Sequence, residues 1–212
     1  MEIINQLNWR YATKKFDASK QLSKDQLNAV LESIRLSPSS YGLQPYQVLV
    51  IKNHEIREKL KEASWGQSQI TDASELIVFC RYTNLNEQHV TDFIEHTANT
   101  RGIDKEQLAA YEGMISGSLK QLDDAAKATW AAKQCYIALG VLLTSCATFN
   151  IDACPMEGFD AKKYDEILGL TSKGLASVVI ATIGFRAADD KHQGEKKVRK
   201  SNENLFIHLE TV

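Results

Sequence analysis

The order of apolar and polar positions along the chain predicts helices that alternate with a few buried strands. Ser23 and Gln26 have the spacing of a capping box, and apolar side chains then recur every three or four residues, which predicts a helix over residues 23–36. Helical character recurs at residues 2–8, 55–64, 86–99, 104–122, 125–149 and 160–169. Apolar, β-branched runs predict buried strands at residues 46–52, 75–82 and 175–185.

The stretch 125–149 is the most informative of the predicted helices. It is amphipathic at first and then apolar on nearly every side, so it must be buried, at the centre either of the domain or of a dimer. Residues 205–209 are apolar and strand-like, and a terminus of this kind needs a surface to bury against. Because no repeat or low-complexity segment marks a boundary, we expect residues 1–212 to form a single α+β domain.

Composition and charge exclude several classes of protein. A hydrophobic content of 43% with only three prolines is typical of a globular domain, and 212 residues suffice for a substantial core. The net charge of −2 gives no reason to expect nucleic acid or an anionic membrane as a partner, so any anion site must be local. The chain has no signal-peptide pattern and no membrane-length apolar run, and we expect a cytoplasmic protein.

Neither the histidines nor the cysteines have metal-binding spacing. His89 and His96 are seven residues apart on a predicted helix. They would lie roughly 10 Å apart along its axis, too far to share one ion. The four cysteines contain no C-x-x-C pair and are Cys80, Cys135, Cys146 and Cys154. We therefore expect buried, reduced thiols, with no disulfide framework and no metal site.

A short cationic stretch near the N-terminus is the first candidate for binding chemistry. Arg10 and Lys14 lie between the apolar anchors Trp9 and Phe16, which places two cations on a ledge at the edge of a core. A guanidinium offers a forked set of donors that suits phosphate, and a lysine is a point charge that can face one anionic oxygen. The alternative is a solvated charged turn. The basic run at residues 196–200 is, by itself, most often a solvated face or a mobile tail.

The segment 37–45 separates a predicted helix from a predicted strand. Two prolines, a glycine and three serines forbid regular structure there, but they supply hydroxyl groups and free backbone donors. Such a loop is either a plain connector or a carrier of binding groups.

Five motifs, in order along the chain, resemble the nitroreductase family of FMN-dependent NAD(P)H oxidoreductases, in its dihydropteridine reductase and oxygen-insensitive nitroreductase branch. The motifs are Arg10-Tyr-Ala-Thr-Lys14, Ser37-Pro-Ser-Ser40 with Gln44-Pro45, Pro155-Met-Glu157-Gly158-Phe159, Ile183-Gly184-Phe185 and Lys197-Val-Arg199. The resemblance implies an α+β fold with a central mixed sheet flanked by helices. It also implies an intertwined homodimer with an FMN at each subunit interface, in which the C-terminal tail adds a strand to the partner's sheet.

The resemblance further implies roles for individual residues. Three cations from the two ends of the chain would hold the FMN phosphate: Arg10, Lys197 and Arg199. Lys14 would lie near the N1 and C2 carbonyl edge of the flavin ring and stabilise its reduced form. Further contacts would come from Pro155, Glu157 and Gly158 along the ring, and from Pro38, Ser39 and Ser40 of the other subunit.

Two positions depart from the family's pattern. Ala12 stands where the family often has a serine. Gln67, Ser68 and Gln69 are the residues available where the family often offers an asparagine and a lysine to the cofactor. The positions that would face the substrate are Lys14, Tyr41, Met114 and Ser116.

The implied reaction is carried by the flavin, with N5 as the reactive centre and no catalytic side chain. The chain has no G-x-G-x-x-G after a strand, so NADH or NADPH would stack on the flavin and leave before the acceptor binds, which predicts ping-pong kinetics. The expected acceptors are nitroaromatics, quinones or similar electron-poor rings. Two alternatives stay open: a non-catalytic protein of the same fold that binds or delivers FMN, and a structural dimer whose basic ledge is only surface.

Overall fold

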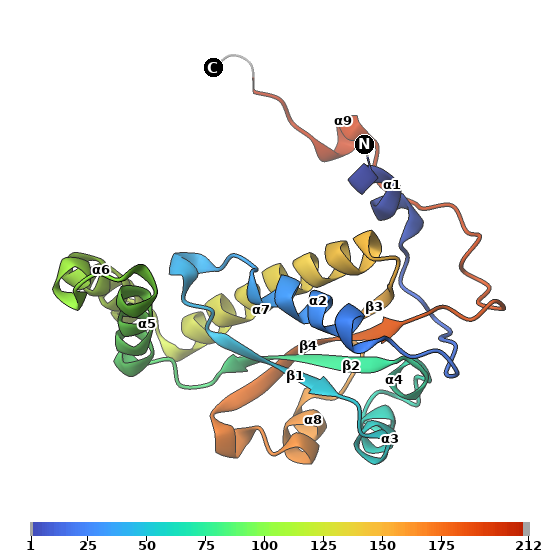
Figure 1. Cartoon of the computed structure of the whole chain (residues 1–212), viewed down its shortest axis with the longest axis horizontal. Helices are drawn as coiled ribbons and strands as arrows, with labels where there is room; N and C mark the ends of the chain where they lie inside the picture. The colour runs from blue at the N-terminus through green and yellow to red at the C-terminus, as the bar shows by residue number, and fades with distance from the viewer. Residues whose placement is uncertain (1, 210–212) are drawn as a thin grey trace.

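A four-stranded sheet with helices on both faces forms the centre of the computed structural model, which describes residues 2–209 (Figure 1). The strands are β1 (Tyr46–Ile51), β2 (Glu75–Tyr82), β3 (Asp152–Met156) and β4 (Leu175–Gly184), in the order β1-β2-β4-β3. The predicted α+β class is confirmed, and β1, β2 and β4 coincide with the three predicted strands.

The fourth strand, β3, carries no apolar β-branched run and was not predicted. It contains Pro155, which cannot donate to a ladder and is tolerated because β3 lies at an edge of the sheet. Its pairing with β4 is antiparallel, with Cys154 opposite Thr182. The ladders β1–β2 and β2–β4 are antiparallel as well, whereas a mixed sheet was expected. Among the described residues, parallel pairing is confined to the isolated bridge between Ala12 and Ala153.

Helices cover both faces of the sheet. On one face lie α2 (Lys24–Arg35) and α7 (Asp124–Thr148), and on the other α3 (His54–Glu62), α4 (Gln69–Asp72) and α8 (Ala161–Leu168). Successive residues of β2 point to opposite faces of the sheet. Val78 packs on the side of α3, α4 and α8, and Phe79 on the side of α2 and α7. Both side chains are fully buried, as expected for a strand covered on both sides.

The remaining helices lie outside these layers. The helices α5 (Glu87–Arg101) and α6 (Ala109–Lys120) pack together beyond one end of the sheet, and α1 (Glu2–Trp9) packs against α7 near the other. The short helix α9 (Asn202–Leu205) lies in the C-terminal segment, close to α1 in Figure 1. Single 3-10 turns occupy Ser40–Gly42, Lys105–Leu108 and Thr171–Lys173. None of the helices within residues 2–209 is both long and apolar enough to cross a bilayer.

Two expectations about burial need correction, and two others depend on a second subunit. The strand β1 is only half buried because it is the other edge of the sheet, and Val50 is exposed. The helix α7 buries one side, but Tyr136 and Ile137 are each 41% exposed on the other. The glycines at 113 and 117 in a predicted helix favour close approach of another helix or of a ligand. A side chain at Gly113 or Gly117 would meet nothing within 4 Å, so no neighbour within residues 2–209 packs closely there.

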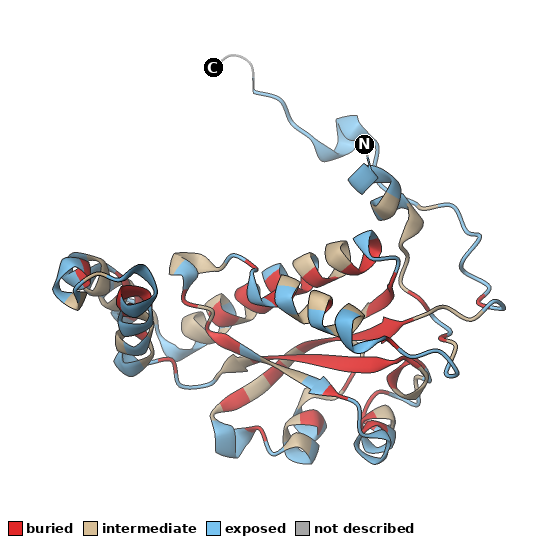
Figure 2. Cartoon of the chain, viewed as in Figure 1, coloured by how far each residue is buried: buried red, intermediate tan, exposed pale blue. Residues whose placement is uncertain are grey.

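The place of the apolar tail is one of the two expectations that depend on a second subunit. Residues 205–209 form no strand, and Ile207 and Leu209 are 87% and 83% exposed, which Figure 2 shows as a pale-blue segment away from the sheet. A strand needs an edge to pair with, and this tail pairs with neither edge of its own sheet, β1 or β3. That residues 1–212 form one domain stays a prediction, and residues 1 and 210–212 lie outside the described part.

The end of α7 places β3, and through it the region of Pro155 and Glu157. Asn150 adopts a left-handed conformation with φ 55°, as expected for the residue that ends this helix. Its N–H donates to the carbonyl of Ala147 at 3.2 Å, and that of Ile151 donates to Cys146 at 2.8 Å. These two bonds form a Schellman motif, which turns the chain directly from helix into strand.

We expect Asn150→Ala to lower the free energy of unfolding by about 1 kcal/mol, because an alanine Cβ is strained in the left-handed region. Asn150→Gly should keep or raise the stability, since glycine adopts this conformation freely. Urea unfolding of both variants checks the prediction. Equal destabilisation by the two substitutions would show that the Asn150 side chain, and not the backbone conformation, is what matters.

Candidate functional site

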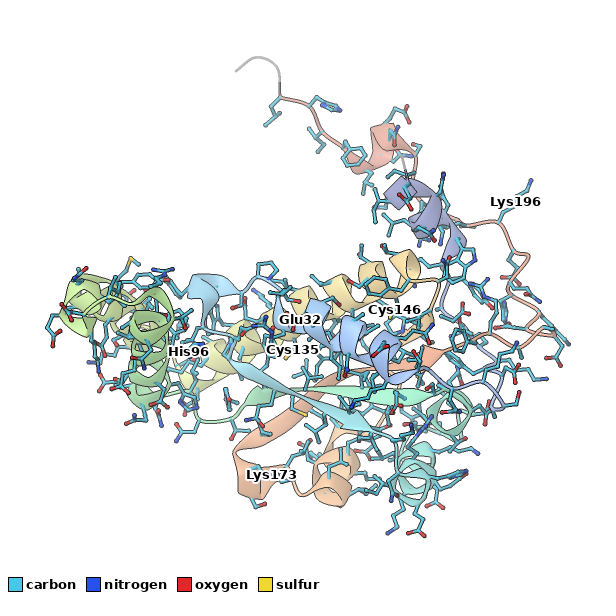
Figure 3. The ribbon with its side chains drawn as sticks, viewed as in Figure 1. Glu32, His96, Cys135, Cys146, Lys173 and Lys196 are labelled. Atoms are coloured by element: carbon cyan, nitrogen blue, oxygen red, sulfur yellow. The ribbon has the colours of Figure 1, made fainter. Side chains whose placement is uncertain are left out.

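A cleft of about 360 Å³ lies between the N-terminal and C-terminal segments of the chain. Its lining residues are Asn8, Trp9, Arg10, Tyr11, Ala12, Lys14, His192, Gln193, Glu195, Lys196, Lys197 and Arg199. Five of them are cations and one, Glu195, is a carboxylate that contacts His192 at 3.0 Å. Figure 3 shows Lys196 on the C-terminal segment where it passes α1. The cleft therefore carries a concentrated positive charge in a protein whose net charge is −2.

The N-terminal wall of the cleft is attached to the sheet edge by backbone bonds. Ala12 forms an isolated parallel bridge with Ala153, and Phe16 an antiparallel one with Arg186. The N–H of Asp17 donates to the carbonyl of Phe185 at 2.8 Å. The aromatic ring of Phe16 is buried in the core, as its predicted role as an anchor requires. Arg10 and Lys14 are thus carried on a ledge fixed beside β3 and the end of β4.

Contacts of Arg186 with Asp152 and with two aromatic rings hold this ledge in place. The Nε and Nη2 atoms of Arg186 lie 2.7 and 2.5 Å from Asp152 Oδ1, and its backbone N–H donates to Oδ2 at 2.8 Å. The guanidinium carbon lies 4.2 Å from the ring centroid of Trp9 and 4.6 Å from that of Tyr11. These distances are those of cation–π contacts. Arg186 is therefore engaged mainly in structural contacts, although its buried Nη2 has no well-oriented hydrogen-bond partner.

Asp190 connects the two walls of the cleft. Its Oδ2 accepts hydrogen bonds from the Tyr11 hydroxyl at 2.9 Å, the Lys14 N–H at 2.9 Å and the Lys15 N–H at 3.0 Å. Its Oδ1 accepts from the His192 N–H at 3.0 Å. Burial alone would raise the pKa of Asp190, but these hydrogen bonds outweigh it and hold the pKa below its ordinary value. The carboxylate therefore stays ionised at neutral pH.

The cations of the cleft repel one another. Burial and the positive charge of Arg199 lower the pKa of Arg10, and burial, Arg10 and Arg199 lower the pKa of Lys197. Within residues 2–209, no carboxylate lies at ion-pair distance from these three side chains. Lys197 Nζ donates to the backbone carbonyl of Arg10, and the buried Nε of Arg10 has no hydrogen-bond partner. A buried donor without a partner is costly and indicates a missing acceptor.

The thiols next to these cations do not supply the missing negative charge. Cys146 lies near the end of α7 (Figure 3), and Arg10 acts on its pKa and on that of Cys154. Burial nevertheless raises the pKa of Cys146 to about 12 and that of Cys154 above its usual value. Both groups are neutral at pH 7, so the cations face no anion from this side.

Five of the predicted cofactor-binding residues meet in this cleft, namely Arg10, Ala12, Lys14, Lys197 and Arg199. The residues that hold them in place, Arg186 and Asp190, were not predicted. Both act through contacts more than 30 residues away along the chain, which no local pattern reveals. The only sequence signal was the pair Asp189-Asp190, a few residues after a buried strand.

A second group of predicted residues lies where β3 ends. Glu157 Oε1 accepts a hydrogen bond from the Tyr136 hydroxyl of α7 at 2.6 Å. Gln67 Nε2 donates to the carbonyls of Gly158 and Ser64 at 2.8 and 3.0 Å. A Cβ on Gly158 would lie 2.9 Å from the ring of the exposed Trp65 side chain, which would have to move to accept it.

These contacts define what the second group can offer to a ligand. The side-chain amide of Gln67 donates one hydrogen bond to the loop of Gly158 and one to Ser64 in its own segment, and Gln69 is 6% exposed. Pro155 is half buried and Glu157 is exposed. Contacts of Gln67 and Gln69 with a cofactor stay predictions.

The third group of predicted residues does not reach the cleft within one chain. The turn of Pro38, Ser39 and Ser40, light blue in Figure 1, lies near α5 and α6, at the opposite end of the sheet from α1. The Ser40 N–H donates to Gln134 Oε1 at 2.8 Å. That the turn contributes to a site built with a second subunit stays a prediction.

The predicted substrate positions are also dispersed in the single chain. Tyr41, with a positive φ of 59°, donates from its hydroxyl to Ser118 Oγ at 3.0 Å and belongs to the end near α6. Met114 is exposed on α6, whereas Ser116 lines a separate small cavity with Leu85. Only Lys14 lies in the cationic cleft. The structure therefore does not bring these four residues together within one copy.

Comparisons with known proteins agree with this architecture. A family model described as "Nitroreductase family" matches residues 7–185. Two relatives share the name "Putative NAD(P)H nitroreductase". SSP0379 of Staphylococcus saprophyticus is 37% identical, and the match covers 98% of this chain and 97% of the relative. YfkO of Bacillus subtilis is 35% identical, and the match covers 90% of this chain and 91% of the relative.

Solved structures show the same fold at lower sequence identity. The B. subtilis protein ydfN has a TM-score of 0.87 at 22% identity, with 98% of both chains covered. A protein of Exiguobacterium sibiricum 255-15, solved in complex with FMN, has a TM-score of 0.80 at 21% identity, with 98% of this chain and 96% of that chain covered.

We expect all four thiols to react slowly with a disulfide reagent in the folded protein. Burial raises the pKa of Cys80, Cys135 and Cys146 to about 12 and that of Cys154 above its usual value, and the thiolate is the reactive form. At pH 8 the native chain should react far more slowly than the same chain in urea, which should titrate four thiols. Rapid reaction of one native thiol would contradict the burial of that site.

Proposed function

The chain belongs to the nitroreductase family, and from this membership and the cationic cleft we propose that it is an FMN-dependent NAD(P)H oxidoreductase. It takes a hydride from NADH or NADPH and reduces nitroaromatic, quinone or similar electron-poor acceptors. The family's role as oxidoreductases supports the reaction type, and an FMN-bound protein of the same fold supports the cofactor.

The unpartnered Nε of Arg10 is the observation that carries the proposal. The cleft brings together the side chains of Arg10, Lys197 and Arg199 with no carboxylate between them, and their mutual repulsion lowers the pKa of Arg10 and of Lys197. A phosphate dianion is the group that fits such a site. Each charge-assisted hydrogen bond to such a group contributes about 1.5–3 kcal/mol. The two arginines present forked donors, and the lysine adds a point charge.

The other cofactor contacts in the proposal follow the resemblance. Lys14 carries positive charge along the same cleft, toward the pyrimidine edge of the ring, and Ala12 lies beside it. Pro155, Glu157 and Gly158 line the ring, with Gln67 and Gln69 behind them. When bound, FMN supplies the hydride chemistry. The protein's own residues bind and orient it, and Lys14 favours the reduced form by its charge.

We include a homodimer in the proposal, with Pro38, Ser39 and Ser40 of one copy completing the site of the other. Exposed apolar side chains on α7 and the tail support it, since one copy leaves Ile137, Ile207 and Leu209 in water. The edge strand β1 borders an apolar groove of about 300 Å³ lined by Leu31, Ile34, Arg35, Gln44, Tyr46, Val48 and Val50. We propose that the partner's residues 205–209 add a strand at this edge.

The order of substrate binding follows from the absence of a separate dinucleotide site. Donor and acceptor use the same face of the flavin in turn, near Lys14, Tyr41, Met114 and Ser116, so the kinetics are ping-pong. A cytoplasmic location is part of the proposal. Four free, buried thiols and the need for a nicotinamide donor support it.

Anaerobic reduction tests the proposed activity. The protein is loaded with FMN and mixed with NADH or NADPH in a stopped-flow instrument, and the flavin absorbance should bleach with at least one donor and return when a quinone or nitroaromatic is added. Initial rates should give parallel double-reciprocal lines. A protein that takes up no FMN overturns the proposal. FMN that binds but stays oxidised with both donors identifies the binding or delivery protein instead.

A substitution tests the phosphate site by itself. We expect Arg199→Ala to weaken FMN binding by roughly 10- to 100-fold, because one charge-assisted bond is lost. Riboflavin, which lacks the phosphate, should bind the variant and the wild type alike. Lys200→Ala is the matched control. It removes an equal charge one residue away from Arg199, and Lys200 does not line the cleft. Titration of flavin fluorescence measures both ligands, and unchanged FMN affinity in Arg199→Ala counts against the site.

A further inference from the structure

Asp190 is the one buried carboxylate that touches both walls of the cleft within the described residues. It is 3% exposed, and its two oxygens receive four hydrogen bonds, from Tyr11, Lys14, Lys15 and His192. Three of the donors belong to the N-terminal wall and one to the C-terminal wall. A single side chain therefore joins segments that are about 180 residues apart in sequence.

We propose that Asp190 is a positioning residue that holds the two walls in register and thereby sets the affinity of the cleft for the phosphate of the flavin. This inference rests on the proposed function, because it concerns the same site. It assigns Asp190 no contact with the cofactor and no part in the reaction itself.

The hydrogen bonds of Asp190 fix the backbone near the cations of each wall. Two successive backbone N–H groups, those of Lys14 and Lys15, point at one oxygen and fix the direction of the chain there. The N–H of His192 points at the other oxygen, at the start of the segment that carries Lys196, Lys197 and Arg199.

The other links between the walls do not replace this joint. The ion pair of Lys15 with Asp189 is exposed, and exposed pairs contribute little. The bond from Lys197 to the carbonyl of Arg10 uses one of the cations that the phosphate requires. The backbone bond from Ala187 to Lys15, at 2.9 Å, fixes the chain before Asp190 and not after it.

The charge of Asp190 does not cancel the positive charge of the cleft. Its lone pairs are occupied by neutral N–H and O–H donors, and no ion pair joins it to Arg10, Lys197 or Arg199. The site thus has an anion that organises the backbone and cations that remain available to a ligand.

Asp190→Asn separates these roles with a minimal change of shape. An asparagine has one acceptor oxygen, and its NH₂ group would face N–H donors on one side or the other. If the oxygen keeps Lys14 and Lys15, the NH₂ meets the His192 N–H, and the local turn that directs the C-terminal segment after Asp190 is lost. If it keeps His192, the N-terminal wall is released.

The experiment compares FMN and riboflavin binding to the full-length wild type, Asp190→Asn and Asp189→Asn by fluorescence titration. We expect Asp190→Asn to weaken FMN binding at least about tenfold and riboflavin binding less than about threefold. Asp189→Asn removes an equal charge at the neighbouring exposed position and should leave both affinities within about threefold of the wild type. Unchanged FMN affinity in Asp190→Asn overturns the inference. An equal loss for both flavins also overturns it, because that pattern indicates damage to the whole fold.

A second variant keeps the test decisive if Asp190→Asn folds poorly. Tyr11→Phe leaves the carboxylate and its backbone donors in place and removes only one hydroxyl donor. It should weaken FMN binding by about twofold to fivefold without changing riboflavin binding, as expected for one lost hydrogen bond. Equal FMN affinity in Tyr11→Phe and the wild type would overturn the inference in that case.

Inorganic phosphate separates this inference from the proposed function. A wild type that binds neither flavin overturns the proposed function, and the cleft is then tested with phosphate alone. Phosphate should raise the unfolding midpoint of the wild type and of Asp189→Asn, and raise that of Asp190→Asn less. Equal shifts in all three proteins would overturn the role of Asp190 independently of flavin.

Discussion

Two buried carboxylates bring the ends of this chain together, and the rest of the site depends on them. Asp152 holds Arg186, which stacks between Trp9 and Tyr11, and Asp190 gathers four donors from both termini. Arg10 and Lys197 are 187 residues apart in the sequence, and these side-chain contacts act together with backbone bonds to bring them to one cleft. The sheet and its helices provide a fixed edge, and the carboxylates attach the two basic segments to that edge.

The result is a site with uncompensated positive charge. Burial and mutual repulsion lower the pKa of Arg10 and Lys197, and the Nε of Arg10 lacks a partner. Holding these groups together costs stability in the absence of an anion, and a bound dianion removes that cost. Any ligand that binds only the folded state also stabilises it by mass action. Binding and folding of the two terminal segments are therefore linked.

Much of the fold was predictable because it is encoded in local patterns. The capping box of Ser23 and Gln26 forms as expected. The apolar run at β2 forms a strand whose side chains alternate between the two faces of the sheet. The strand β3 was missed because Asp152 and Pro155 are poor strand formers, and its place depends on pairing with β4. The tail at residues 205–209 could not be placed, since its burial depends on a surface outside one chain.

The residues of the candidate site also fall into those that local patterns predict and those that they do not. The cations Arg10, Lys14, Lys197 and Arg199 were recognisable from short motifs, and they do line one cleft. Asp190 and Arg186 were not recognisable, because their function lies in contacts between distant segments. Tyr136 and Trp65 illustrate the same limit, since each contacts the loop of Glu157 and Gly158 from another element. A motif identifies the groups that meet a ligand better than the groups that hold them.

A crystal structure of the protein with FMN bound tests the central claim most directly. The account predicts that the phosphate lies within hydrogen-bonding distance of Arg10, Lys197 and Arg199 of one copy, with Asp190 still bridging the two walls. A phosphate bound elsewhere, with these three side chains in solvent, would contradict it.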